Sequence, residues 1–328
     1  MVKTGMASKW HVHAPGYAQF INGYEKSKVT AVWDDDAKRG MEWAEELGCE
    51  FYESYDDMLK HADIDAVICD APTTAHKDIL IKAARAGKHI FTEKALCPTV
   101  AECIEVKKAV EEAGVTFAIS YPQKGRPSVQ FARSMVEKNA FGKITFVRIR
   151  DAHNGVSGHW LPDYWFEKAD AAGGAMMDLG CHPMYLIAHI LGRPKKITSV
   201  FTSPYGKPVD ENAVAVMEFE DGAIGVAETG FVSAFSPQEI EIIGTEGTML
   251  VRNEDVSFKS AVLSGGFSEF SRPELPEWKA QPIELFINAV DSGRGSPEGL
   301  GMDDAILLTE LLENSYRAYE DGKVIEFK

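Results

Sequence analysis

Asp178 and His182 are the two residues of this sequence whose types and spacing point most directly to chemistry. They lie in the stretch GGAMMDLGCHP, which begins at Gly173. On a helix, a spacing of four residues places both side chains on one face. A carboxylate beside an imidazole can hold and pass a proton near neutral pH, because an ordinary histidine titrates near pH 6.5. The two leading glycines would let the chain pass close to a ligand. A buried structural hydrogen bond is the alternative, and the stretch alone leaves both open.

The same expected helix carries further polar residues. Tyr185 and His189 continue the spacing of Asp178 and His182, so four polar side chains form a stripe on an otherwise apolar helix. A single buried histidine is more often structural than catalytic, but a stripe of four favours a functional site. Pro183 lacks a backbone N–H, so we expect a local break just after His182.

Lys94 is the cation that could meet these groups. It lies in TEKAL, at the end of a buried apolar run, and the carboxyl ends of such strands are where open α/β sheets bind ligands. The alternative is a surface lysine that covers apolar neighbours with its stem and keeps its charge in water. Pro72 and His76, in the stretch APTTAH, are expected at the same sheet edge, where an N-capping Thr73 or Thr74 is the structural alternative.

The stretch GMASKWH occupies the place of a dinucleotide-binding glycine loop. Gly5 matches the first glycine of GxGxxG, Ala7 replaces the second, and Trp10 stands near the third. An ordinary turn between a strand and a helix explains this stretch equally well.

Asp34 ends the second expected strand, where an acid of a dinucleotide site accepts hydrogen bonds from the ribose. Asp35 and Asp36 follow it, and no arginine is adjacent in the sequence to neutralise a 2′-phosphate. A carboxylate facing that phosphate would pair like charges at a cost of roughly 1 kcal/mol. We therefore expect NAD rather than NADP. Helix N-capping is the alternative explanation for Asp35 or Asp36.

No metal site is expected. The histidines of HVH, His11 and His13, are expected on different faces of the chain and at no useful helical spacing. The sequence also contains no HExxH motif, no cysteine cluster and no GxxxxGK[ST] loop, so a nucleoside triphosphate is not expected either.

The elements that would position these residues alternate over the first 120 or so residues. Strands are expected at 28–34, 63–72, 89–96 and 115–121, and helices at 35–48, 74–88 and 99–114. The strands lack strict polar alternation, which is typical of strands buried on both faces. Repetition of strand, helix and strand predicts a doubly wound parallel sheet in a first domain, 1–121.

After Tyr121 the pattern changes to alternating runs. Strands are expected within 143–153, 196–205, 211–233 and 238–251, and helices at 127–139, 283–290 and 303–319. Asp221 and Gly222 form a two-residue hairpin signal. The second domain, 122–328, is therefore expected to be α+β, with a large, mostly antiparallel sheet that leaves one face open.

Charge and composition exclude some classes of binding partner. The formal net charge of −16 would repel phosphate backbones, which excludes nucleic acid as an expected partner. No apolar run is long enough to cross a bilayer. The five cysteines are odd in number and lack CxxC spacing, and the N-terminal stretch lacks a secretory pattern. We expect reduced thiols and a cytoplasmic protein.

Two stretches together resemble the Gfo/Idh/MocA family, the group of glucose–fructose oxidoreductase and inositol dehydrogenase. AGKHIFTEKAL is similar to the family's AGKHVxxEKPL, and AGGAMMDLGCHP is similar to its GGGxxxDxGxH. The closing segment, from ELFINAV to VIEF, also resembles the family's ending, so the likeness covers nearly the whole chain. Ala95 departs from the family's proline, Tyr185 stands where many members have Asp, and Lys124 where many have Arg.

The resemblance implies site residues. Lys94, Asp178 and His182 would be catalytic. The dinucleotide cleft would be lined by Gly5, Ala7, Ser8, Trp10, Asp34, Ala71, Pro72, Thr73, His76, Glu93 and Lys94. Substrate would meet the catalytic residues together with Tyr121, Trp160 and Trp165, although dense aromatic residues are also typical of a core.

The resemblance also implies an activity and an assembly. It predicts hydride transfer between a nicotinamide cofactor and a secondary alcohol or ketone of a sugar, polyol or glycoside. A glycosidase that oxidises its sugar only transiently, and a regulator that binds dinucleotide without catalysis, are the alternatives. Retention of Lys94, Asp178 and His182 argues against the regulator. A homodimer or homotetramer through the open sheet face is expected.

Overall fold

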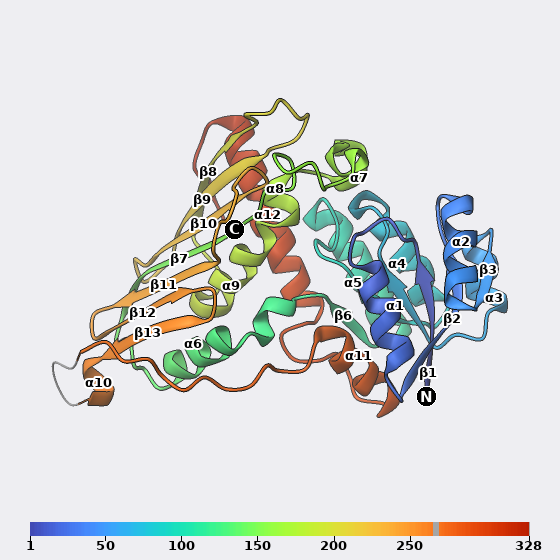
Figure 1. Cartoon of the computed structure of the whole chain (residues 1–328), viewed down its shortest axis with the longest axis horizontal. Coiled ribbons are helices and arrows are strands. Elements are labelled where there is room, and N and C mark those ends of the chain that lie inside the picture. The colour runs from blue at the N-terminus through green and yellow to red at the C-terminus, as the bar shows by residue number, and fades with distance from the viewer. Residues whose placement is uncertain (265–268, 328) are drawn as a thin grey trace. The chain divides into compact units, whose positions relative to one another are not determined.

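The computed structural model describes residues 1–264 and 269–327, and it divides the chain into two compact units. The first unit comprises Met1–Tyr121 and Ala280–Thr309, and the second comprises Pro122–Lys279 and Glu310–Lys328 (Figure 1). The chain therefore leaves the first unit, returns to it late, and leaves it again.

The described strands of the first unit form a six-stranded sheet in the order β3-β2-β1-β4-β5-β6. All neighbouring strands run parallel. The strands are β1 (Val2–Ala7), β2 (Ser27–Trp33), β3 (Glu50–Tyr52), β4 (Ala66–Cys69), β5 (His89–Thr92) and β6 (Phe117–Ile119). Strand order reverses at β1, which confirms the doubly wound parallel sheet. Sheets of this kind bind ligands beyond the carboxyl ends of the strands at the reversal, here β1 and β4.

Helices connect these strands. They are α1 (Ala14–Gly23), α2 (Ala37–Leu47), α3 (Tyr55–His61), η1 (Thr73–Ala75), α4 (His76–Arg85), α5 (Val100–Ala113) and α11 (Pro282–Asp291). Local chemistry fixes their ends: the Asp36 side chain accepts from the first free N–H groups of α2, and Gly48 ends α2 in a left-handed conformation with φ 64°. Thr99 and Gly114 do the same for α5.

The segment 280–309 differs from the expected domain division, which assigned it to the second domain. In the structure it belongs to the first unit, where the rings of Phe286 and Phe91 lie 5.7 Å apart between α11 and β5. The apolar side of α11, with Ile283 and Phe286 buried, needs a partner, and strands β5 and β6 supply it.

The described strands of the second unit form an eight-stranded sheet in the order β13-β12-β11-β7-β10-β9-β8-β14. They are β7 (Ile144–Ala152), β8 (Lys196–Thr202), β9 (Asn212–Glu218), β10 (Ile224–Gly230), β11 (Glu239–Gly244), β12 (Gly247–Arg252), β13 (Asp255–Ser260) and β14 (Ile325–Glu326). Among the described pairs, β7 and β10 run parallel and the others antiparallel. The mostly antiparallel sheet is confirmed, and β9 and β10 form the hairpin around Asp221 and Gly222.

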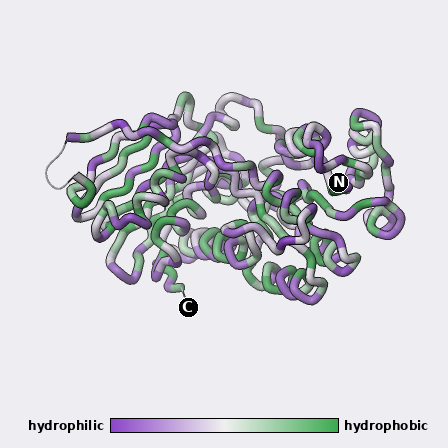
Figure 2. Tube along the Cα trace, turned by 90° about the horizontal axis from the view of Figure 1, so that it is seen from below, coloured by the Kyte–Doolittle hydropathy of each residue, from purple (hydrophilic) through white to green (hydrophobic). Residues whose placement is uncertain are grey.

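Helices of the second unit are short except α6, α9 and α12. They are η2 (Pro122–Gly125), α6 (Pro127–Glu137), η3 (Asp163–Phe166), α7 (Lys168–Ala171), α8 (Ala175–Asp178), α9 (Cys181–Leu191), α10 (Ala261–Ser264) and α12 (Met302–Asp321), whose first part belongs to the first unit. Helix α9 packs on β7 and β10. Hydrophobic and hydrophilic stretches alternate along the strands of this sheet (Figure 2), because one face is covered and the other is open.

No helix in the described part of the chain is both long and apolar enough to cross a membrane.

Candidate functional site

The segment that carries Asp178 and His182 is two helices rather than one. Asp178 is the last residue of α8, and His182 lies in the first turn of α9. The expected break just after His182 is therefore misplaced, because the chain breaks between Asp178 and Cys181, before His182. Gly180 explains the break: its N–H bonds to the carbonyl of Ala175, five residues back, and a Cβ on Gly180 would lie 2.6 Å from the sulfur of Met176. Pro183 is accommodated in the first turn of α9, where a helix needs no N–H.

His182 is buried and oriented by Tyr185. Its Nδ1 lies 2.8 Å from the Tyr185 hydroxyl, and that hydroxyl accepts a hydrogen bond from the backbone N–H of Gln123 at 3.2 Å. The Nζ of Lys124 lies 6.0 Å from the centre of the Tyr185 ring. Two of the four residues of the predicted stripe therefore make one hydrogen-bonded unit.

Asp178 is oriented by a tryptophan. The indole N–H of Trp165 donates to Oδ2 of Asp178 at 3.2 Å, and Trp165 is buried. The other predicted tryptophan, Trp160, is about half exposed, and its indole donates to Asn154. Of the residues predicted for substrate in the second unit, the structure thus brings Trp165 directly to Asp178.

The carboxyl edge of the first unit's sheet gathers most of the predicted dinucleotide residues. Ser8 follows β1, Asp34 follows β2, 71–73 follow β4, and Glu93 and Lys94 follow β5. Tyr121 follows β6; it is buried, and its hydroxyl donates to the carbonyl of Asp304.

The loop after β1 is built differently from the expected glycine turn. Gly5 lies inside β1, where a Cβ would come 3.0 Å from Ile64, so its role there is packing. Ala7 ends the strand, and Ser8 makes the turn in a left-handed conformation with φ 72°. Trp10 is buried, and its backbone N–H donates to the Ser8 hydroxyl.

Asp34 is already bound by its own chain. Its carboxylate accepts from the backbone N–H of Lys9 at 2.8 Å and of Asp36 at 2.9 Å, and from the Arg39 guanidinium at 2.6 Å. Burial raises the pKa of Asp34 despite these donors. No arginine is adjacent to Asp34 in the sequence, but one lies beside it in the structure. Arg39, in the first turn of α2, forms ion pairs with Asp34 and Asp35.

Glu93 is the centre of a buried polar cluster. Its carboxylate accepts from the hydroxyl of Tyr17, contacts Nδ1 of His13 at 2.9 Å, and accepts from the backbone N–H of Lys94 at 3.1 Å. Burial alone would raise the pKa of Glu93, but the electrostatic pull of His11, His13 and Lys94 holds it well below its ordinary value. Glu93 is therefore an anion that ties the loop after β1 to the end of β5.

Among the residues that the structure describes, His11, His13 and Glu93 are spaced closely enough to hold a metal ion, with donor atoms within 4.8 Å of one another. The expected separation of the histidines is wrong, since they lie in a turn with ring centroids 4.5 Å apart. Nδ1 of His11 accepts from the backbone N–H of His13, which can only donate. The expectation of no metal stays a prediction.

His76 and Lys94 are both buried. The ring of His76 contacts the carbonyls of Ala71, Ala95 and Leu96 at 3.0 to 3.1 Å, so it links the segments after β4 and β5. Burial lowers its pKa. Lys94 is 4% exposed, so the alternative of a lysine with its charge in water is wrong.

Sequence reasoning missed four residues that shape these sites. Arg39 acts on Asp34, five positions away, and Tyr17 acts on Glu93. Asp210 and Tyr316 act on the segment that carries Asp178, and all of these contacts except that of Arg39 join positions far apart in the sequence. Only Arg39 left a signal, since a residue in the first turn of the helix after β2 can fold back onto the strand end.

Comparison with known proteins matches this architecture. Residues 5–121 match the model of an oxidoreductase family with an NAD-binding Rossmann fold, and residues 129–250 match the GFO/IDH/MocA C-terminal domain. A scyllo-inositol 2-dehydrogenase (NAD(+)) of Bacillus subtilis (strain 168) is 30% identical over 272 residues, which is 78% of this chain and 75% of the relative. A 2,7-anhydro-N-acetylneuraminate hydratase of Escherichia coli (strain K12) is 29% identical over 73% of this chain, a match that spans 65% of that relative's length.

A solved structure gives the same fold. A levoglucosan dehydrogenase in complex with NADH and L-sorbose aligns with a TM-score of 0.86 over 100% of this chain and 99% of that chain, at 18% identity. Because two family models together span well over half of the sequence, the conclusion does not depend on one relative. The chain belongs to the Gfo/Idh/MocA family of NAD-binding oxidoreductases.

Proposed function

We propose that this chain transfers a hydride between NAD and a secondary alcohol or ketone of a sugar, polyol or glycoside. Membership of the family over both of its domains carries the proposal, and relatives named for an inositol and for a sugar anhydride support the substrate class. Within the second unit, the orientation of His182 by Tyr185 and of Asp178 by Trp165 supports roles for these two residues.

The first unit fits a dinucleotide. Its strand order is that of sheets that bind dinucleotides at the carboxyl ends of their strands, and α1 begins directly after the β1 loop, where such sheets bind the pyrophosphate. Asp34 lies at the ribose position, although Arg39 must yield one carboxylate oxygen before a ribose hydroxyl can bind there.

Bound NAD supplies the hydride acceptor, and the chain's own residues handle the proton and the charge. Nδ1 of His182 is engaged by Tyr185, so we assign Nε2 as the atom that exchanges a proton with the substrate hydroxyl. Asp178 orients the His182 side chain or shares the proton with it. The ammonium of Lys94 stabilises negative charge that develops on the substrate oxygen.

A second candidate is a reaction with no net oxidation. It is favoured by the relative named as a hydratase, since hydration changes no overall oxidation state. In this case the same residues would oxidise a sugar transiently, and bound NAD would return to its starting form.

A panel of sugars, polyols and glycosides with NAD separates the two candidates. If the chain catalyses net oxidation, NADH absorbance should increase with some of the compounds in the panel. The second candidate predicts product by chromatography, no net NADH, and loss of activity when NAD is stripped from the protein. No product and no NADH from any member of a broad panel would contradict both.

Cofactor choice gives a further prediction. Asp34 and its acidic neighbours favour NAD, but Arg39 is the cation placed to meet a 2′-phosphate, so we expect only modest discrimination against NADP. Arg39→Ala should remove a charge-assisted contact worth about 1.5 kcal/mol and raise the NADP-to-NAD ratio of dissociation constants roughly tenfold. Calorimetric titration measures both constants. Lys38→Ala, an exposed neighbour that bridges Glu42, is the control and should leave the ratio unchanged.

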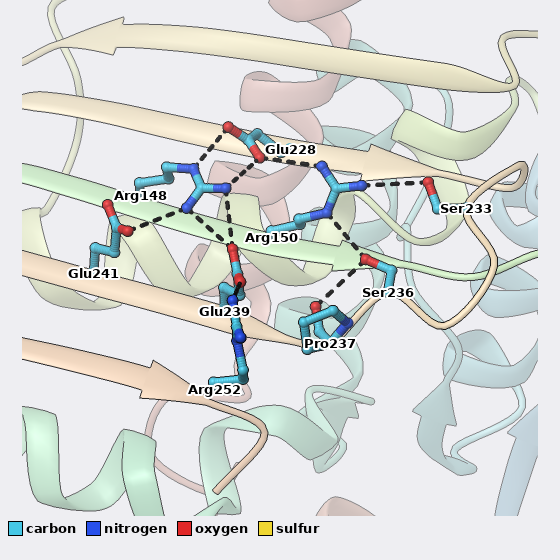
Figure 3. A network of polar contacts seen from close by, with 9 residues as sticks. All are labelled: Arg148, Arg150, Glu228, Ser233, Ser236, Pro237, Glu239, Glu241 and Arg252. Atoms are coloured by element: carbon cyan, nitrogen blue, oxygen red, sulfur yellow. Dashed lines mark hydrogen bonds and ion pairs between the residues drawn. The ribbon is translucent and has the colours of Figure 1, made fainter. Parts of the chain in front are cut away.

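The open sheet face supports a homodimer or homotetramer. Arg148 on β7 contacts Glu228 at 2.8 Å, Glu239 at 3.2 Å and Glu241 at 3.3 Å (Figure 3). Strand register aligns Val216 on β9 and Leu250 on β12 with Arg148 in one row across the sheet, and both are exposed. A face of ordered charges interleaved with exposed apolar side chains is typical of an interface between copies.

We expect the 36.1 kDa chain to elute as a dimer or tetramer. Glu228→Lys places a third cation beside Arg148 and Arg150, so it should convert the assembly to a monomer. Light scattering measures the mass of the assembly. Glu42→Lys on α2, in the first unit, carries the same charge change and should leave the mass unaltered. A monomeric wild type would contradict the assignment.

A further inference from the structure

We infer that Asp210 and Tyr316 are positioning residues that fix the turn carrying Asp178 and His182. The inference rests on the proposed function, in which those two residues act on the substrate. It is carried by hydrogen bonds that lie entirely within the second unit.

Asp210 binds the start of α8 through three of its oxygens. Its Oδ1 accepts from the backbone N–H of Gly174 at 2.9 Å, its Oδ2 from Met176 at 2.7 Å, and its carbonyl oxygen from Ala175 at 2.7 Å. These are N–H groups that a helix cannot satisfy within itself. A residue 36 positions away from Gly174 therefore caps this helix.

Tyr316, on α12, completes the cap. Its hydroxyl donates to Oδ1 of Asp210 at 2.6 Å and accepts from the N–H of Met177 at 3.2 Å and of Gly174 at 3.0 Å. Burial, together with the nearby charge of Asp210, raises the pKa of Tyr316 well above its ordinary value, so the hydroxyl keeps the proton it donates. Its ring packs edge-on against Phe201 with centroids 5.0 Å apart.

The paired glycines at the start of the segment are explained by this contact. A Cβ on Gly173 would lie 2.3 Å from the Tyr316 hydroxyl oxygen, and one on Gly174 would lie 2.1 Å from the carbonyl oxygen of Asp210. No side chain fits at either distance. The close approach predicted from the glycines is therefore made to the chain's own Asp210 and Tyr316.

The cap bears on chemistry because α8 is too short to hold itself. Four residues form no stable helix alone, so the direction of α8 is set by what binds its first turn. Asp178 ends this helix, and the backbone N–H of His182 bonds to Leu179 directly after it. A shift of about 1 Å in reacting groups can cost about 100-fold in rate.

Tyr316→Phe tests the inference in the full chain, because it removes one hydroxyl and keeps the ring. We expect kcat to fall at least tenfold, while the substrate KM and the NAD dissociation constant stay within twofold of wild type. Hydrogen exchange at the Met177 amide should accelerate at least tenfold. Tyr319→Phe is the matched control, since Tyr319 lies on the same helix with its ring stacked on the same Phe201.

Asp210→Asn gives a second arm if Tyr316→Phe folds poorly. Asparagine retains one acceptor oxygen, so its kcat should lie between those of wild type and Asp210→Ala. Turnover of Tyr316→Phe equal to that of Tyr319→Phe would overturn the inference, and so would unchanged exchange at Met177. Failure of the proposed function is a different result, namely a wild type that turns over no member of the substrate panel.

Discussion

His182→Asn should lower turnover by roughly 100-fold to 10,000-fold, the range that general acid–base catalysis contributes. Asparagine approximates the shape of the imidazole edge but cannot exchange a proton near neutral pH. NAD binding should stay within twofold of wild type, because His182 lies in the second unit. Steady-state kinetics and calorimetric titration measure these quantities separately.

The pH profile identifies the group responsible. A histidine base must lose its proton before it can accept one, so wild-type oxidation should rise with pH through the range in which histidines titrate, near 6.5. This limb should vanish or move in His182→Asn. His189→Asn, two turns later on α9, is the matched control and should keep the limb.

Asp178 should belong to the same unit as His182. Residues that act as a unit lose activity non-additively, so adding Asp178→Asn to His182→Asn should cost less than about threefold more. A structural pair would behave differently, since each substitution would lower the melting temperature by several degrees and residual activity would keep the wild-type limb. Variants with lowered melting temperatures and an unchanged limb would show that the pair is only structural.

Local patterns predicted four of the six described strands of the first unit, but gave no ranges for β1, β3, α1 or α3. Buried apolar runs gave β2, β4 and β5 within a few residues, because strands covered on both faces need no polar alternation. Gly48 and Gly114 marked helix ends, since each adopts a left-handed conformation that glycine tolerates best.

Contacts between distant residues were beyond the sequence. The return of 280–309 to the first unit depends on which sheet offers an apolar surface to α11, and the helical period alone does not say. The break at Gly180 depends on how Met176 packs against it. The break predicted from Pro183 was misplaced, because a proline in the first turn does not interrupt a helix. Likewise, the sequence around Gly174 does not predict its contacts with Asp210 and Tyr316.

The positive charge of Lys94 should contribute at least as much to turnover as a hydrogen-bond donor that stabilises developing negative charge. Lys94→Ala should lower turnover roughly 100-fold or more, with NAD binding retained. Lys88→Ala removes another partly enclosed ammonium from the same unit, one that donates to the carbonyl of Ile64, and should leave turnover near wild type. Added ethylamine should restore part of the activity of Lys94→Ala alone, since a small ammonium ion can occupy the space of the missing side chain. The rescue separates lost charge from lost packing, because an alanine variant that is merely unstable gains nothing from an amine. A fully active Lys94→Ala protein would remove lysine from the mechanism and leave the proton to Asp178 and His182.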